Sequence, residues 1–437
     1  MAFVILVIVS GVILQHEIHT APLEFDEPAW VMTSVYFVDL VRTGDFTSSA
    51  WDPDFWGAFG SINPHLGRVW IDFSLSFHPD TKNLVFGKAD AHKLNLEEVK
   101  IAPDAVPAEA IAMGRYGHAL SGLMCLLLVF VLAYRLGGVS AAVLSGVLTL
   151  SSSVFVHVVT RIMTDGPFNF CMLLLTVLIV RRNESDPKSE GRLNGWLEGL
   201  LVGIAFNIKA TALILSLVIL FAVTLFRIKQ SPRQSVGEIF RYGRICFFAL
   251  FSCILFNPYL WPTASPPPGG GDPLVLMPAR FSNREVDQST LQGKAPVWLR
   301  LPELHLRWNR QIKAQASYHK REYDREVHVP QKIQRFLLDY NTPALLAAGI
   351  LGLFAVFRML RPTNKSRVPF RMHLDSWQNG KLHLLLIVTV IHLAWVVVLS
   401  PLDWDRYYLP GLLHLYVLEG VLLSATWKTL NQGSLKT

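Results

Sequence analysis

Apolar runs separated by short polar and basic segments dominate the chain, and this pattern predicts helices that cross a membrane. A helix that spans the hydrocarbon core needs roughly 20 predominantly apolar residues, and about ten runs approach that length. They are Ala2–Gln15, Ala119–Tyr134, Val139–His157, Pro167–Val180, Trp196–Asn207, Ala210–Phe226, Ile245–Leu260, Phe336–Phe357, Leu382–Ser400 and Leu409–Trp427. The pattern therefore predicts an all-α polytopic membrane protein with about ten transmembrane helices.

Composition and charge agree with this class. Hydrophobic residues make up 51% of the 437 residues, which is typical of a membrane protein. The formal net charge is +7, but the basic residues border the apolar runs instead of forming one aromatic-rich patch. This distribution argues against nucleic acid as a partner. The Lys/Arg bias of the short loops places both termini in the cytoplasm. Those loops contain Arg181, Arg182, Arg227, Arg241, Arg358 and Arg371.

Two long segments, residues 16–112 and 261–335, then face the extracytoplasmic side. In the first, residues 27–41 have an amphipathic pattern that predicts a helix lying in the membrane interface. All four cysteines lie in apolar runs, so neither segment has a thiol for a disulfide framework or a thiolate metal site. We expect one integral membrane domain over residues 1–437, with its first apolar run retained as an anchor.

Two adjacent acids, Asp26 and Glu27, stand shortly after the first apolar run. Charged side chains are expensive to place beside hydrocarbon. The two acids are therefore either part of a solvated loop or groups that carry out chemistry at the membrane surface. The predicted topology puts Asp165 on the same side, at the turn that precedes the fourth apolar run.

Three basic residues are predicted at this same outer surface, where the positive-inside rule disfavours them. Arg115 opens the second apolar run, Lys209 lies between the fifth and sixth, and Arg406 precedes the last. A fixed cation can hold a phosphate through directed hydrogen bonds. The structural alternatives are a snorkelling role for Arg115 and ordinary ion pairs, such as one between Arg161 and Asp165, four residues apart.

Acids and cations gathered at one membrane depth suit one kind of reaction. Cations hold the phosphate of a lipid-linked leaving group, and a carboxylate activates the acceptor. A divalent metal stays open as a cofactor. Glu322, His319 and His328 carry suitable ligand atoms, but their spacing matches no tight metal motif.

An ordered set of short motifs resembles the GT-C glycosyltransferases. The resemblance is to protein O-mannosyltransferases, lipid A aminoarabinose transferases and bacterial relatives of the dolichyl-phosphate-mannose-protein mannosyltransferase type, and it spans nearly the whole chain. The motifs are Phe25-Asp26-Glu27-Pro28, Gly114-Arg115-Tyr116, Arg161-Ile162-Met163-Thr164-Asp165-Gly166-Pro167, Gly203-Ile204-Ala205-Phe206-Asn207-Ile208-Lys209-Ala210-Thr211 and Asp405-Arg406-Tyr407-Tyr408-Leu409-Pro410. Each motif alone is weakly specific, and the specificity lies in their order and topology.

The resemblance implies the GT-C fold and an inverting sugar transfer at the extracytoplasmic face. The donor would be a polyprenyl-phosphate sugar and the acceptor a hydroxyl of a lipid, a glycan or a protein. Asp26 would be the general base, while Glu27 and Asp165 would orient the acceptor or sustain the local field. The groups implied to neutralise the departing lipid phosphate are Arg115, Lys209, Arg406 and Tyr407. The compact size and the lack of an appended carbohydrate-binding domain favour a bacterial plasma membrane.

A transporter or flippase of lipid-linked sugars is the alternative, because it would use the same phosphate contacts. Such a protein is expected to carry polar residues deep in several spans, helices broken at the midplane or an internal repeat. No repeat is visible, and the ionisable residues cluster at one predicted interface. This distribution favours the glycosyltransferase.

Overall fold

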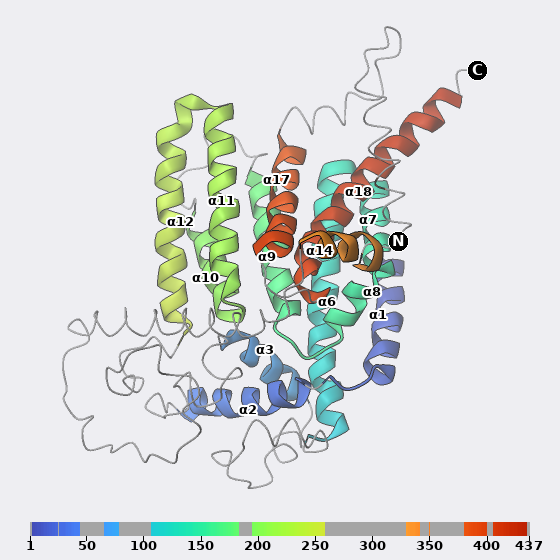
Figure 1. The fold of residues 1–437 in the computed structure, drawn as a ribbon, viewed down its shortest axis with the longest axis vertical. Coiled ribbons are helices and arrows are strands. Elements are labelled where there is room, and N and C mark those ends of the chain that lie inside the picture. Colours follow the sequence, from blue (N-terminus) through green and yellow to red (C-terminus); the bar gives the residue numbers. More distant parts are fainter. Residues whose placement is uncertain are drawn as a thin grey trace, which may run out of the picture.

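The computed structural model describes residues 2–24, 26–43, 65–77, 106–182, 195–257, 329–340, 380–399 and 405–434, together with Gly349. Every regular element in these ranges is helical, which confirms the predicted all-α class, and Figure 1 shows the long helices standing side by side as a bundle. The bundle consists of α1 (Ala2–Thr20), α6 (Ala108–Gly137), α7 (Val139–Ser151), α9 (Asp165–Arg182), α10 (Trp196–Ile208), α11 (Thr211–Gln230), α12 (Ser235–Leu255), α17 (Lys381–Ala394) and α18 (Asp405–Ser434). The shorter elements are α2 (Glu27–Thr43), α3 (Leu66–Leu75), α8 (Ser153–Val159), α14 (Val329–Arg335), a 3₁₀ turn at Pro232–Gln234 and π-helical turns at Phe336–Tyr340 and Trp395–Leu399.

Five helices of the described ranges are long and apolar enough to cross a membrane, and the bent pair α7–α8 is a sixth candidate. The five candidate spans are Phe3–Thr20, Ala108–Gly137, Thr211–Gln230, Lys381–Val398 and Arg406–Trp427. The apolar run expected at 336–357 lies largely outside the described residues, so the total of about ten spans stays a prediction.

The third apolar run is two helices instead of one. The chain bends by 71° between α7 and α8. Ser152 lies at the break, where its hydroxyl accepts a hydrogen bond from the backbone N–H of Phe155 at 3.3 Å. A serine that caps the following turn offers the backbone an alternative to a continuous helix. The bend turns α8 away from the axis of α7 and leads the chain into residues 160–165.

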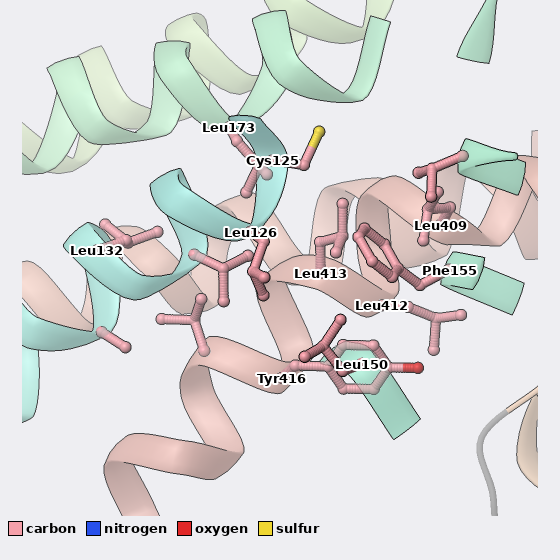
Figure 2. Packing of buried hydrophobic residues seen from close by; sticks show 14 of the residues in the cluster. Cys125, Leu126, Leu132, Leu150, Phe155, Leu173, Leu409, Leu412, Leu413 and Tyr416 are labelled. Atoms are coloured by element: carbon pink, nitrogen blue, oxygen red, sulfur yellow. The ribbon is translucent and has the colours of Figure 1, made fainter. Parts of the chain in front are cut away.

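Apolar side chains from α1, α6, α7, α8, α9, α17 and α18 form the main buried cluster, part of which is shown in Figure 2. Ten of its members are labelled there: Cys125, Leu126, Leu132, Leu150, Phe155, Leu173, Leu409, Leu412, Leu413 and Tyr416. A second cluster joins α9, α10, α11, α12 and α17. The two clusters share α9 and α17, so these helices lie where the two halves of the bundle meet.

Helix α2 crosses one end of the bundle, as Figure 1 shows, and α3 packs against it. The amphipathic helix predicted over residues 27–41 is confirmed and extends to Thr43. Arg68 of α3 is fully buried between the rings of Trp30 and Phe37, with its guanidinium carbon 5.5 Å and 4.6 Å from their centroids. Burial lowers the pKa of Arg68 to about 9.

The opposite end of the bundle carries a compact ion-pair network. Arg241 of α12 is buried and donates to Glu198 at 2.7 Å and to Glu238 at 3.3 Å. Glu238 also accepts a bond of 3.1 Å from Arg182 of α9. Residues predicted on the cytoplasmic side therefore meet at one end, where their charges join α9, α10 and α12.

The close approach of α10 to α12 predicts opposite effects of alanine at two glycines. A Cβ at Gly199 would lie 2.6 Å from the carbonyl oxygen of Ile245, whereas one at Gly243 would meet nothing within 4 Å. We expect Gly199→Ala to lose about 1–3 kcal/mol through overpacking. Gly243→Ala should gain about 0.5–1 kcal/mol from helix propensity. Thermal melts in lipid nanodiscs measure both. Equal melting temperatures for the two variants would contradict this packing.

Candidate functional site

A buried ion pair between Glu27 and Arg115 lies at the end of the bundle where α2 and α3 are found. Nε of Arg115 donates to Oε1 of Glu27 at 2.8 Å, and Nη2 donates to Oε2 at 2.6 Å. The side chain of Glu27 is 0% exposed and that of Arg115 is 5% exposed. Arg115 is therefore no snorkelling arginine, and its two-point pairing is the strongest geometry open to an arginine and a carboxylate.

The remaining donors of Arg115 are also engaged. Nη1 donates to the carbonyls of Ile18 and Ala21 at 3.0 Å each, and Nη2 donates to that of Pro22 at 2.8 Å. A guanidinium has five N–H donors, and all of them are used here. Arg115 thereby fixes the C-terminal end of α1 and the start of α2 against α6.

Glu27 also binds two backbone N–H groups. Its Oε1 accepts from Ile162 at 3.1 Å, and its Oε2 accepts from Glu24 at 2.9 Å. Ile162 belongs to the turn between α8 and α9, which is 135 residues away in the sequence. One carboxylate therefore holds the segment before α2, the helix α6 and this turn in fixed relation.

The turn at residues 160–165 sends its side chains in different directions. The ion pair between Arg161 and Asp165 considered from the sequence is not formed. Arg161 lies instead 3.6 Å from Glu24 and 3.9 Å from Glu17, while Asp165 pairs with Lys209. The sequence interpretation failed because the turn is not helical before Asp165, so the four-residue spacing brings no two side chains together.

Asp165 and Lys209 form a second ion pair, between the start of α9 and the junction of α10 with α11. The ammonium of Lys209 lies 4.3 Å from the ring centroid of Tyr407 and 5.6 Å from that of Phe168. The anion that Lys209 was expected to require is therefore Asp165. Burial lowers the pKa of Lys209, and nearby Arg406 lowers it further, whereas Asp165 acts in the opposite direction.

Arg406 and Tyr407, from the first turn of α18, complete this second group. The guanidinium of Arg406 lies 5.7 Å from the ring centroid of Tyr407 and contacts the sulfur of Met163 at 3.3 Å. Asp26, Asp165 and Arg406 all act electrostatically on the phenol of Tyr407. Asp26, which directly precedes Glu27 in the chain, therefore lies within electrostatic range of this group.

Asp26 is half-buried and directly precedes α2, and its carbonyl accepts a hydrogen bond from the backbone N–H of Trp30 at 3.0 Å. The N-terminal end of a helix carries partial positive charge, which favours the ionised form of a nearby carboxylate. A base has to be ionised before it can accept a proton, so this position suits the role predicted for Asp26.

The seven residues singled out from the sequence thus fall into two neighbouring groups. Arg115 and Glu27 bind each other, and Asp165, Lys209, Arg406 and Tyr407 form the second group, with Asp26 within electrostatic range of Tyr407. His118 was missed: its ring nitrogens face the carbonyl oxygens of Gly114 and Met163, which fastens α6 to the turn. The sequence signal that could have identified His118 is its position about one helical turn after Arg115.

The three possible metal ligands considered from the sequence lie outside the described residues; they are Glu322, His319 and His328. Within the described ranges, no group of three or more His, Cys, Asp or Glu side chains is arranged to hold a metal ion.

The fold and these charged groups together define a polytopic membrane protein with a hub of buried ion pairs at one end of its helices. A sequence profile of the family described as dolichyl-phosphate-mannose-protein mannosyltransferase matches residues 83–261. Among solved structures, the chain is similar to the crystal structure of ArnT from Cupriavidus metallidurans bound to undecaprenyl phosphate, with a TM-score of 0.54 and 14% identity. No curated protein sequence gives a significant match.

These two findings confirm the predicted resemblance to the GT-C superfamily. The similarity to ArnT covers 99% of this chain and 62% of the ArnT chain, so this chain spans less than two thirds of that protein. At this identity the similarity establishes the fold, which is the GT-C fold expected from the motifs.

The buried pair predicts a large loss of stability when Arg115 is removed. We expect Arg115→Ala to cost about 3–5 kcal/mol, because Glu27 is left buried without its counterion. Arg115→Lys should fall between this variant and the parent, since a lysine has three donors and no planar fork. Thermal melts in nanodiscs measure the loss.

Arg233→Ala is the control for this prediction. Arg233 is exposed in the 3₁₀ turn at Pro232–Gln234, so its removal should change the stability by no more than about 0.5 kcal/mol. If Arg115→Ala melted at the temperature of Arg233→Ala, the ion pair would contribute no more than an exposed side chain.

Proposed function

We propose that this protein transfers a sugar from a polyprenyl-phosphate donor to an acceptor hydroxyl, with inversion, at the extracytoplasmic membrane face of a bacterial cell. The observation that carries the proposal is the grouping of Lys209, Arg406 and Tyr407, with Asp26 within electrostatic range of Tyr407. A cation group and a carboxylate beside it match the two needs of the reaction, which are a stabilised leaving group and an activated nucleophile. The family profile and the fold of ArnT support the same class of enzyme.

Asp26 is the proposed general base. In a single displacement, the acceptor hydroxyl passes its proton to the carboxylate of Asp26 as its oxygen attacks the anomeric carbon. The bond between that carbon and the phosphate oxygen breaks, and polyprenyl phosphate leaves with the electron pair. Glu27 is less suited to this role, because its two oxygens already accept four hydrogen bonds.

Lys209 and Arg406 are the proposed partners of the departing phosphate, on which negative charge develops as the bond breaks. Tyr407 lies against the ammonium of Lys209, so its ring holds that cation in place without neutralising it. Arg115 is engaged by the protein at all five donors and is the least suited of the predicted phosphate ligands. Asp165 positions Lys209.

A flippase of lipid-linked sugars is favoured by one observation, which is that polar side chains do lie inside the spans. His392 and His414 stack with ring centroids 4.7 Å apart, and His414 bonds to Thr176 at 2.8 Å. These groups join α9, α17 and α18, and each imidazole also bonds to a carbonyl one turn earlier in its own helix. Helix fastening accounts for them, so sugar transfer stays the preferred function.

Replacement of the proposed base predicts loss of chemistry without loss of donor binding. We expect Asp26→Asn to lower transfer from radiolabelled polyprenyl-phosphate sugars by about 10²–10⁴-fold. Binding of undecaprenyl phosphate, measured in nanodiscs, should be unchanged. Asp39→Asn, on an exposed position of the same helix, is the control and should transfer normally. Full transfer by Asp26→Asn would show that Asp26 is not the base. If the wild type transferred sugar to no acceptor, the proposed enzymatic function would be contradicted.

The lowered pKa of Lys209 predicts an alkaline limit to phosphate binding. As pH rises through this pKa, which lies below the ordinary lysine value, the ammonium loses its charge and binding of undecaprenyl phosphate should weaken. Lys209→Arg keeps its charge, so its limit should move to higher pH.

A pH series of binding measurements checks this shift. Lys229→Arg, at an exposed position near the other end of α11, is the matched control and should keep the wild-type profile. An unchanged alkaline limit in Lys209→Arg would show that another group binds the phosphate.

A further inference from the structure

Arg161 is a buried cation, and two of its three side-chain nitrogen atoms have no hydrogen-bond partner in the described part of the chain. Its side chain is 2% exposed, and its Nε and Nη1 groups make no hydrogen bond within the described part of the chain. The nearest carboxylates are those of Glu24, 3.6 Å from Nε, and Glu17, 3.9 Å from Nη2. Both separations are longer than a hydrogen bond. Since a buried donor without a partner is costly, this guanidinium calls for an acceptor atom.

Glu17, Glu24 and His157 surround Arg161 and are open to solvent. Their side chains are 31%, 33% and 35% exposed, respectively. The imidazole Nε2 of His157 lies 3.8 Å from Glu24. We call these four residues, Glu17, Glu24, His157 and Arg161, the Arg161 cluster. It combines partly exposed hydrogen-bond acceptors with a buried guanidinium that lies 3.6 Å from Glu24 and 3.9 Å from Glu17.

The Arg161 cluster is held in register with the proposed base. The backbone N–H groups of Glu24 and Ile162 both donate to the carboxylate of Glu27, which directly follows Asp26. Glu24 is two residues before Asp26, and Arg161 is next to Ile162. The cluster therefore has a fixed place relative to Asp26, although none of its side chains touches the proposed phosphate ligands in the contacts described above.

The cluster and Lys209 come from elements on different sides of α6. The cluster comes from α1, α8 and the segments that follow them, whereas Lys209 comes from the junction of α10 and α11. Arg406, the other proposed phosphate partner, contacts Met163, two residues after Arg161. Figure 1 shows α1 and α8 on one side of α6 and α10 and α11 on the other. In a displacement with inversion, the acceptor approaches the anomeric carbon from the side opposite the leaving phosphate. With the phosphate at Lys209, the acceptor comes from the side of the cluster.

The charges of the cluster indicate the chemistry of the acceptor. Two carboxylates and one guanidinium leave it negative while His157 is neutral, so a phosphate-bearing acceptor is disfavoured. A sugar hydroxyl is neutral and can donate to Glu24 while it accepts from Arg161. Neighbouring hydroxyls on one sugar ring could engage Glu24 and Glu17 together. A serine or threonine acceptor has one hydroxyl, which the base itself must take.

We propose that the Arg161 cluster is the acceptor subsite and that it binds adjacent hydroxyls of an uncharged glycan. This assignment rests on the proposed sugar transfer for its role, but the binding site itself can be tested without any turnover.

The binding test uses a photoactivatable octyl mannoside as the probe and the full-length protein in nanodiscs. We expect the probe to label peptides that contain residues 16–24 and 156–162. Glu24→Gln keeps the size of the side chain and the backbone bond to Glu27, and it should weaken labelling by about 10- to 100-fold, the effect of one hydrogen bond to a charged group.

Two further variants keep the binding test decisive. Glu109→Gln removes an exposed carboxylate at the start of α6 and should be labelled like the wild type. Glu17→Gln repeats the test if Glu24→Gln proves unstable in thermal melts. Labelling that is insensitive to both cluster variants, or that falls elsewhere in the chain, overturns the subsite.

The activity test separates the subsite from the proposed function. Transfer to octyl mannoside should show a KM raised by about 10- to 100-fold in Glu24→Gln. Hydrolysis of the donor, in which water replaces the acceptor, should be unchanged. A wild type that neither transfers nor hydrolyses but is still labelled in a Glu24-dependent way contradicts the enzyme and supports the site. Preferred transfer to a serine/threonine peptide, unaffected by Glu24→Gln, overturns the glycan assignment.

Discussion

The buried pair of Glu27 and Arg115 is the interaction on which the arrangement of this site depends. Taking two charges out of water costs several kcal/mol for each ion, and their attraction compensates only when the remaining hydrogen-bonding groups are satisfied. Here the five donors of Arg115 and four acceptor positions of Glu27 are used. Because these partners come from α1, α2, α6 and the turn after α8, the pair fixes the positions of four separate segments.

The same pair separates the roles of two adjacent acids. Glu27 has its carboxylate committed to Arg115 and to two backbone N–H groups, whereas Asp26 stands half-buried at the start of α2. The four hydrogen bonds to the oxygens of Glu27 fill the acceptor positions of its carboxylate, so none is left for the hydroxyl of an acceptor. In the proposed reaction, Glu27 is therefore a positioning group, and Asp26 is the carboxylate available as the base.

The sequence predicted the helices well and their limits less well. Apolar periodicity located the long helices, but α6 begins at Ala108 instead of Ala119 because Arg115 and His118, in its polar first turns, find partners in other segments, Glu27 and the carbonyl of Met163. The break at Ser152 lies within three consecutive serines, Ser151 to Ser153, a polar interruption that the predicted run Val139–His157 passed over. Among the candidate site residues, the sequence identified the charged positions but not their partners. The bond from Arg115 to Glu27 joins residues 88 positions apart, and no spacing rule reaches that far.

In the proposed reaction, the pairing of Lys209 with Asp165 limits how a lipid phosphate can bind. An ammonium that already has a carboxylate partner gains less from a phosphate than an isolated one, since the new contact must compete with the old. Binding is therefore expected to be strongest where Arg406 shares the phosphate and Asp165 keeps part of its contact with Lys209. When the phosphate leaves, Asp165 would be in place to neutralise the ammonium again. Under this proposal the ion pair lowers the affinity for the lipid phosphate and so favours its release after sugar transfer.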